Sequence, residues 1–191
     1  MTRMLIATVA GAAVLFFWSF IAWTVLPLHD ASIRDPGAAA PALETALRSL
    51  PEDGAYFIPY ISREDMADET TEHAWRARHE TGPVGVLMVV PGGASPMAPS
   101  MFMRGALNCL ASSLLAVVLL TVAAFRLRGS VQRVAFVTAL GLFSSLAADL
   151  AYQVWMYFPA DYTTAMVVDR LLGWLLVGLV HAAIIRIPGA E

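Results

Sequence analysis

Four long apolar stretches constrain the fold of this chain more than any other feature. They cover residues 4–26, 103–125, 134–157 and 165–185. Each is long enough to cross a bilayer as a helix, which takes roughly 20 predominantly apolar residues. The composition agrees, because 58% of the 191 residues are hydrophobic and only 14% are charged, whereas a typical soluble domain is about 25% charged. The sequence therefore predicts an α-helical integral membrane protein with four transmembrane helices.

A charged, proline-bearing insert separates the first apolar stretch from the other three. We expect residues 1–26 to form an N-terminal transmembrane anchor, residues 27–102 a small α+β extracytoplasmic domain inserted between helices 1 and 2, and residues 103–191 a three-helix transmembrane region. The apolar run of the anchor exceeds the about 7–15 residues of a signal-peptide core, and no small-residue cleavage site follows it closely. We therefore expect the anchor to stay uncleaved.

The insert carries alternating helical and strand patterns. Residues 38–50 have the periodicity of an amphipathic helix, and residues 55–60 are typical of an aromatic-rich edge strand. A second helix is expected to start at Ser62 as its cap and to run to about residue 80. The apolar run 84–90 predicts a strand buried on both faces or against the first helix. The insert should thus be an α-β-α-β module with two strands, too small to be very stable alone.

The placement of arginine predicts the orientation. Arg3, the loop with Arg126, Arg128 and Arg133, and Arg186 fall on one side if the four spans alternate. That side should be cytoplasmic, because basic residues concentrate in cytoplasmic loops. All 12 basic residues are arginine, which we interpret as the coding bias of a GC-rich bacterial genome. We therefore expect a bacterial inner (plasma) membrane protein with both termini in the cytoplasm and the insert in the periplasm.

Ionisable residues inside the predicted spans are the leading functional candidates, because charges are costly in a bilayer. Counted at about 1.5 Å per residue from the cytoplasmic helix ends, Asp149 and Arg170 lie at nearly the same depth on adjacent antiparallel spans. Asn108 reaches a similar level, and Asp169 is next to Arg170. Two interpretations stay open. In the first, these four residues form a polar layer at the bottom of a cavity. In the second, Asp149 and Arg170 only pair with each other and hold the hairpin together, since buried charges need partners.

No metal or cofactor site is predicted. His181 lies in the fourth span, where a b-type haem would need a second histidine at matching depth, so a hydrogen bond to a neighbouring helix is the simpler role. Met97, Met101 and Met103 occur where the chain re-enters the membrane. Thioethers favour Cu(I), but methionine also fills irregular apolar boundaries. Cys109 is the single cysteine, so it forms no internal disulfide, and it suits the role of a small packing residue.

The motifs of common enzymes are missing, so we expect binding rather than catalysis. There is no hydrolase elbow, P-loop, Rossmann fingerprint or Cys-x-x-Cys motif, and the net charge of −3 argues against nucleic acid. The first hypothesis is an accessory component of an inner-membrane or envelope complex, which contacts a membrane or envelope protein, or a second copy, through the aromatic edge of Tyr56, Phe57 and Tyr60. The alternative is a small-molecule or lipid binder or transporter that uses the polar layer around Asp149 and Arg170.

Overall fold

The computed structural model describes residues 1–127 and 129–185 and is mostly helical. Arg128 and Arg186, which entered the orientation argument, lie outside the described residues. The chain divides into two compact units. The helical unit comprises Met1–Arg34, Met97–Ala151 and the described residues from Pro159 onward, and the second unit comprises Asp35–Pro96 and Tyr152–Phe158.

Four helices in the described part of the chain are long and apolar enough to span a membrane. Three of them are single α-helices: α1 (Thr2–Thr24), α4 (Pro99–Ala123) and α7 (Ala160–Ile184). The remaining one, third in chain order, consists of α5 (Ser130–Ser144), the π-helical turn η3 (Ser145–Asp149) and α6 (Leu150–Trp155). These helices coincide with the four predicted apolar stretches to within a few residues at each end.

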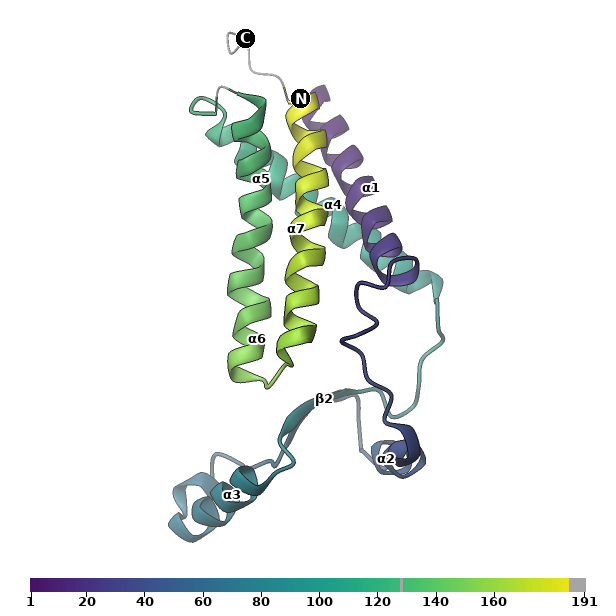
Figure 1. Ribbon diagram of the computed structural model, residues 1–191, viewed down its shortest axis with the longest axis vertical. Coiled ribbons are helices and arrows are strands. Elements are labelled where there is room, and N and C mark those ends of the chain that lie inside the picture. Colours follow the sequence, from purple (N-terminus) through teal and green to yellow (C-terminus); the bar gives the residue numbers. More distant parts are fainter. Residues whose placement is uncertain (128, 186–191) are drawn as a thin grey trace. The chain divides into compact units, whose positions relative to one another are not determined.

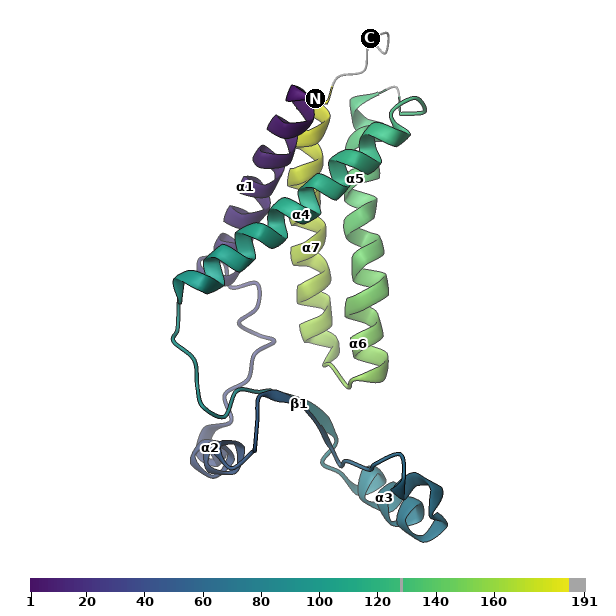
Figure 2. The ribbon, with the colours of Figure 1, turned by 180° about the vertical axis from the view of Figure 1, so that it is seen from behind.

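The helix α7 occupies the centre of the helical unit. It packs against α5 and against α1, and α1 packs in turn against α4. Figures 1 and 2 show α4 crossing α5 and α7 obliquely, and α4 makes little contact with α5. The helices α4 and α5 are therefore joined mainly through α1 and α7.

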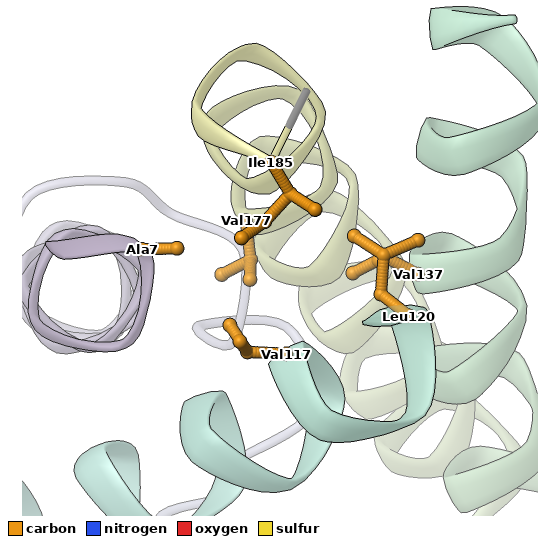
Figure 3. Close-up of a cluster of buried hydrophobic side chains, with 6 residues drawn as sticks. All are labelled: Ala7, Val117, Leu120, Val137, Val177 and Ile185. Carbon is orange, nitrogen blue, oxygen red and sulfur yellow. The ribbon is translucent and has the colours of Figure 1, made fainter. Parts of the chain in front are cut away.

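A cluster of buried apolar side chains joins the helices toward the end of the unit where α1 begins and α7 ends. Figure 3 shows its members, Ala7, Val117, Leu120, Val137, Val177 and Ile185. They come from α1, α4, α5 and α7 and from the residue that follows α7. Lipid tails are as apolar as these side chains, so close packing rather than the hydrophobic effect holds such helices together.

Gly11 permits the close approach of α1 to its neighbours. A Cβ atom at this position would lie 2.2 Å from His181 Nε2 and 2.5 Å from Ser113 Oγ. Gly11 and Ala7 are both buried and lie one turn apart on the same face of α1. Small residues at this spacing are typical of helix–helix contacts in membranes.

The second unit has the α-β-α-β order predicted for the insert. Its elements are the 3-10 turn η1 (Gly37–Ala39), α2 (Ala40–Arg48), β1 (Gly54–Ile58), the 3-10 turn η2 (Asp65–Ala67), α3 (Glu69–Thr81) and β2 (Gly85–Val89). The two strands form an antiparallel sheet in which Tyr56 pairs with Leu87. No residue of α2, β1, α3 or β2 is buried. The prediction that the second strand is buried, on both faces or against the first helix, is therefore wrong, and Met88 in that strand is 73% exposed.

The start of α3 also differs from the prediction. Ser62 does not cap it, because Ser62 Oγ accepts the N–H of Asp65 at 3.0 Å and opens the 3-10 turn η2 instead. Asp68 is the N-cap, since its Oδ1 accepts hydrogen bonds from Thr71 Oγ1 at 2.7 Å and from Thr71 N at 2.8 Å. These two bonds, the side-chain one foremost, lower the pKa of Asp68 because they favour the charged carboxylate.

Substitution of Gly11 tests the close packing of α1. Gly11→Ala should destabilise the protein by about 1–3 kcal/mol, the usual cost of overpacking a tight site, because the new methyl group collides with His181 and Ser113. Thermal unfolding in detergent measures the change. Gly105→Ala in α4 is the matched control, since its Cβ would meet nothing nearer than Phe16 Cε2 at 3.6 Å. Equal unfolding temperatures for the two variants would contradict the packing described here.

Candidate functional site

Asp149 and Arg170 form a bidentate ion pair between the third and fourth of the helices that are long and apolar enough to span a membrane. Asp149 is the last residue of η3, and Arg170 lies in α7. Arg170 Nε donates to Asp149 Oδ2 at 2.9 Å, and Arg170 Nη2 donates to Asp149 Oδ1 at 2.8 Å. The Asp149 side chain is 8% exposed and the Arg170 side chain 31%, so the carboxylate is the more deeply buried partner. The pairing predicted from matching depth is confirmed, and any functional role of the pair stays a prediction.

Asp169 contacts α1 and the turn that follows α1. Trp18 Nε1 donates to Asp169 Oδ1 at 2.7 Å, and His29 Nε2 lies 3.3 Å from Asp169 Oδ2. The His29 ring also stacks on Trp23, with 3.9 Å between the ring centroids. Consecutive residues of a helix project about 100° apart. Asp169 and Arg170 therefore contact different neighbours of α7.

A cavity of about 320 Å³ lies in the helical unit beside these contacts. Of the predicted polar layer, Asn108, Asp169 and Arg170 line it, whereas Asp149 is not part of the lining and is bonded to Arg170. The rest of the wall combines hydroxyl, tryptophan and smaller apolar side chains, namely Ser19, Ser112, Ser144, Trp18, Trp23, Trp174, Leu15, Cys109 and Met166. Ligand sites measure about 300–1,000 Å³, so this cavity has room for a small molecule or a headgroup.

Two features of the site were not predicted from the sequence. His29 lies beyond the first span and was given no role, yet its side chain is only 4% exposed, and its Nδ1 has no hydrogen-bond partner in the described part of the chain. The nearest signal in the sequence is the pair Trp18 and Trp23 near the end of the first span, and nothing in their spacing connects them with Asp169. The π-helical turn that ends at Asp149 was also missed, although such turns are frequent at functional sites.

His181 belongs to a second buried polar contact, formed with Ser113 of α4. Ser113 Oγ donates to the carbonyl oxygen of Thr8 at 2.8 Å and lies 3.1 Å from His181 Nε2. A hydroxyl has one proton to give, so His181 Nε2 is the donor in the second bond. This leaves His181 Nδ1 as a buried acceptor without a partner among residues 1–127 and 129–185. The hydrogen bond expected for His181 is present and joins α7 to α4.

The three methionines near the start of α4 are exposed, whereas Cys109 is buried. Met97 precedes α4, while Met101 and Met103 lie in its first turns, and all three are more than half exposed. Residues two apart in a helix project about 200° apart, so Met101 and Met103 do not share a face, which argues against a joint copper contact. Cys109 is 8% exposed and lines the cavity.

The three residues of the predicted aromatic edge, Tyr56, Phe57 and Tyr60, do not form one continuous surface. Phe57 is 43% and Tyr60 69% exposed. Neighbouring residues of a strand project to opposite faces of the sheet, so Tyr56 and Phe57 lie on different faces. The Tyr56 hydroxyl donates to the carbonyl oxygen of Glu52 at 2.5 Å, which ties this side chain to its own turn. Phe57 and Tyr60 are thus the members that remain available for contact.

Comparison with known proteins gives no further guide. No protein-family model matches the chain, and neither a curated protein nor a solved structure matches it.

A double-mutant cycle tests the Asp149–Arg170 pair. Arg170→Ala should cost about 3–5 kcal/mol, because it leaves the buried Asp149 carboxylate unpaired. Asp149→Ala should cost less, because the Arg170 side chain is one-third exposed and lines the cavity. The double variant should be less destabilised than the sum of the single ones, by thermal unfolding and by the amount of protein in the membrane. Strict additivity would count against contact between the two side chains.

Proposed function

We propose that this protein is a non-enzymatic, multipass membrane protein that binds a small amphipathic molecule or a lipid in the polar cavity of its helical unit. The supporting observation is that Asn108, Asp169 and Arg170 line one cavity among helices long and apolar enough to span a membrane. Polar groups at membrane depth are costly unless they pair or serve a function. Asn108 and Arg170 Nη1 have no hydrogen-bond partner in the described part of the chain, so their bonding capacity is available to a ligand.

The membrane and the orientation belong to the same proposal. We infer a bacterial inner membrane, both termini in the cytoplasm and the second unit in the periplasm, on the basis of arginine placement. The helical unit supports an alternating arrangement of the four helices, because the cluster of Figure 3 joins the first turns of α1 and α5 to the last turns of α4 and α7. Four spans that alternate bring Arg3, Arg126 and Arg133 to one side.

Reporter fusions test this orientation. A periplasm-active reporter fused after Pro91 should be active, and the same reporter fused after Glu191 should be inactive, because the two sites lie on opposite sides in the proposed topology. A cytoplasm-active reporter at both positions serves as the control and should give the reverse pattern. Periplasmic activity of the C-terminal fusion would overturn the orientation.

A second candidate function is assembly, in which the second unit contacts a larger membrane or envelope complex. The observation in favour is that its two helices and two strands bury none of their residues. Each strand of a two-stranded sheet also has one edge that pairs with no other described strand. An added strand could pair with such an edge. Phe57 and Tyr60 would then be part of the contact.

Purification in a gentle detergent followed by mass spectrometry separates the two candidates. Cavity binding predicts a monodisperse protein that retains a small molecule or lipid. Asn108→Leu and Ser112→Phe should each reduce this retention severalfold, because they remove a polar group or fill space in the cavity. Leu115→Trp is the control, since Leu115 lies in the same helix and is 59% exposed. A retained partner protein together with unaltered ligand content in the cavity variants would favour assembly instead.

A further inference from the structure

We infer that the cavity binds a zwitterionic group, with an anionic phosphate at Arg170 and an ammonium at Asp169 beside the cavity tryptophans. This inference rests on the proposed function, because it names the chemical class of the ligand for the same cavity. It goes beyond that proposal by assigning opposite charges to two parts of the cavity wall. The arrangement of α7 carries it, since Asp169 and Arg170 are adjacent in sequence and both line the cavity.

Arg170 supplies the anion-binding part of the wall. Its Nε and Nη2 atoms are held by Asp149 at 2.9 Å and 2.8 Å, which fixes the plane of the guanidinium group. Its second terminal nitrogen, Nη1, makes no hydrogen bond to residues that the structure describes. Arginine binds phosphate oxygens through such donors, and the planar group is oriented before the ligand arrives. Asn108 and Ser112 line the same cavity and add further donors.

Asp169 supplies the cation-binding part of the wall. Trp18 Nε1 and His29 Nε2 hold its two carboxylate oxygens at 2.7 Å and 3.3 Å, so the group is fixed in place at the cavity. Trp18, Trp23 and Trp174 also line this space. The faces of tryptophan rings attract ammonium groups, and a nearby carboxylate strengthens the attraction.

The charges at the cavity favour a zwitterion over simpler ligands. Asp169 and Arg170 line the cavity, and Asp149 lies behind Arg170 as its partner, so these three groups together carry one excess negative charge. A purely anionic ligand would add a second negative charge that nothing compensates. A purely cationic ligand would neutralise Asp169 but leave Arg170 Nη1 without an acceptor. A zwitterion satisfies both parts of the wall.

Two sources can supply this chemistry, a phospholipid headgroup or a soluble phosphodiester that carries an amine. The cavity of about 320 Å³ is at the lower end of the about 300–1,000 Å³ of ligand sites. It therefore accommodates the headgroup but not two acyl chains, so a bound phospholipid must keep its chains outside the cavity.

The test uses the full-length protein in nanodiscs that contain phosphatidylethanolamine, phosphatidylcholine and phosphatidylglycerol in equal amounts. Native mass spectrometry after release from the nanodisc should show retention of the two zwitterionic lipids over phosphatidylglycerol. Asp169→Asn keeps an acceptor for Trp18 but removes the charge, and it should reduce this preference about tenfold, as expected for the loss of one charge-assisted interaction. Asp149→Asn/Arg170→Gln removes both charges of the pair together and should reduce total lipid retention.

Arg34→Gln/Asp161→Asn is the matched control, because this pair, at 2.5 Å, is exposed and does not line the cavity; it should leave lipid retention unaltered. Added glycerophosphoethanolamine, a phosphodiester with one negative and one positive charge, displaces the lipid if the soluble ester is sufficient and fails to displace it if the chains are needed; both results support the zwitterion. A wild-type preference for phosphatidylglycerol overturns this inference and leaves the proposed function standing. Lipids retained in the nanodisc ratio, unaltered by Asn108→Leu or Ser112→Phe, overturn both.

Discussion

Polar contacts made by one helix, α7, join the other three long apolar helices of the unit. Asp169 accepts a hydrogen bond from Trp18 of α1, Arg170 holds Asp149 at the end of η3, and His181 contacts Ser113 of α4. Between helices in lipid there is no hydrophobic driving force, so packing and such hydrogen bonds decide which helices associate. The order of the helices follows from these three positions on α7, because each projects to a different neighbour.

The packing of the helical unit differs between these positions, and it is tight around His181 and more open around Asp169. Around His181, small residues such as Ala7 and Gly11 allow backbones to approach, and the apolar cluster of Figure 3 fills the space. Around Asp169, large tryptophan side chains take the place of small residues, and a cavity remains. Trp18 reaches Asp169 only because Gly173 leaves room, since a Cβ there would lie 2.8 Å from Trp18 Cδ1. The same helices thus pack tightly near His181 and leave a polar cavity near Asp169.

The sequence predicted the parts of this arrangement that depend on length and depth. Apolar runs define the spans because bilayer thickness sets their length, and the rise per residue brought Asp149 and Arg170 to one level. Depth alone does not give the direction in which a side chain projects, so the separate partners of Asp169 were missed. His29 was missed because it lies in a turn, where no periodicity indicates contacts. The π-helical turn leaves no signal in composition. The predicted burial of the second strand is wrong because no described element covers this apolar strand on both faces.

The position of α4 bears on how the cavity could act. Asn108, Cys109 and Ser112 come from α4, which packs mainly on α1, whereas Arg170 belongs to α7, the helix that packs on α5. Because α4 and α5 touch little, few contacts between these two helices hold this part of the wall together. A ligand that bonds to Arg170 and to Asn108 at once would add a connection between α7 and α4 that the protein alone lacks at this level. Ligand binding would then stabilise the unit as well as fill the cavity, because a ligand that binds only the folded state raises its stability.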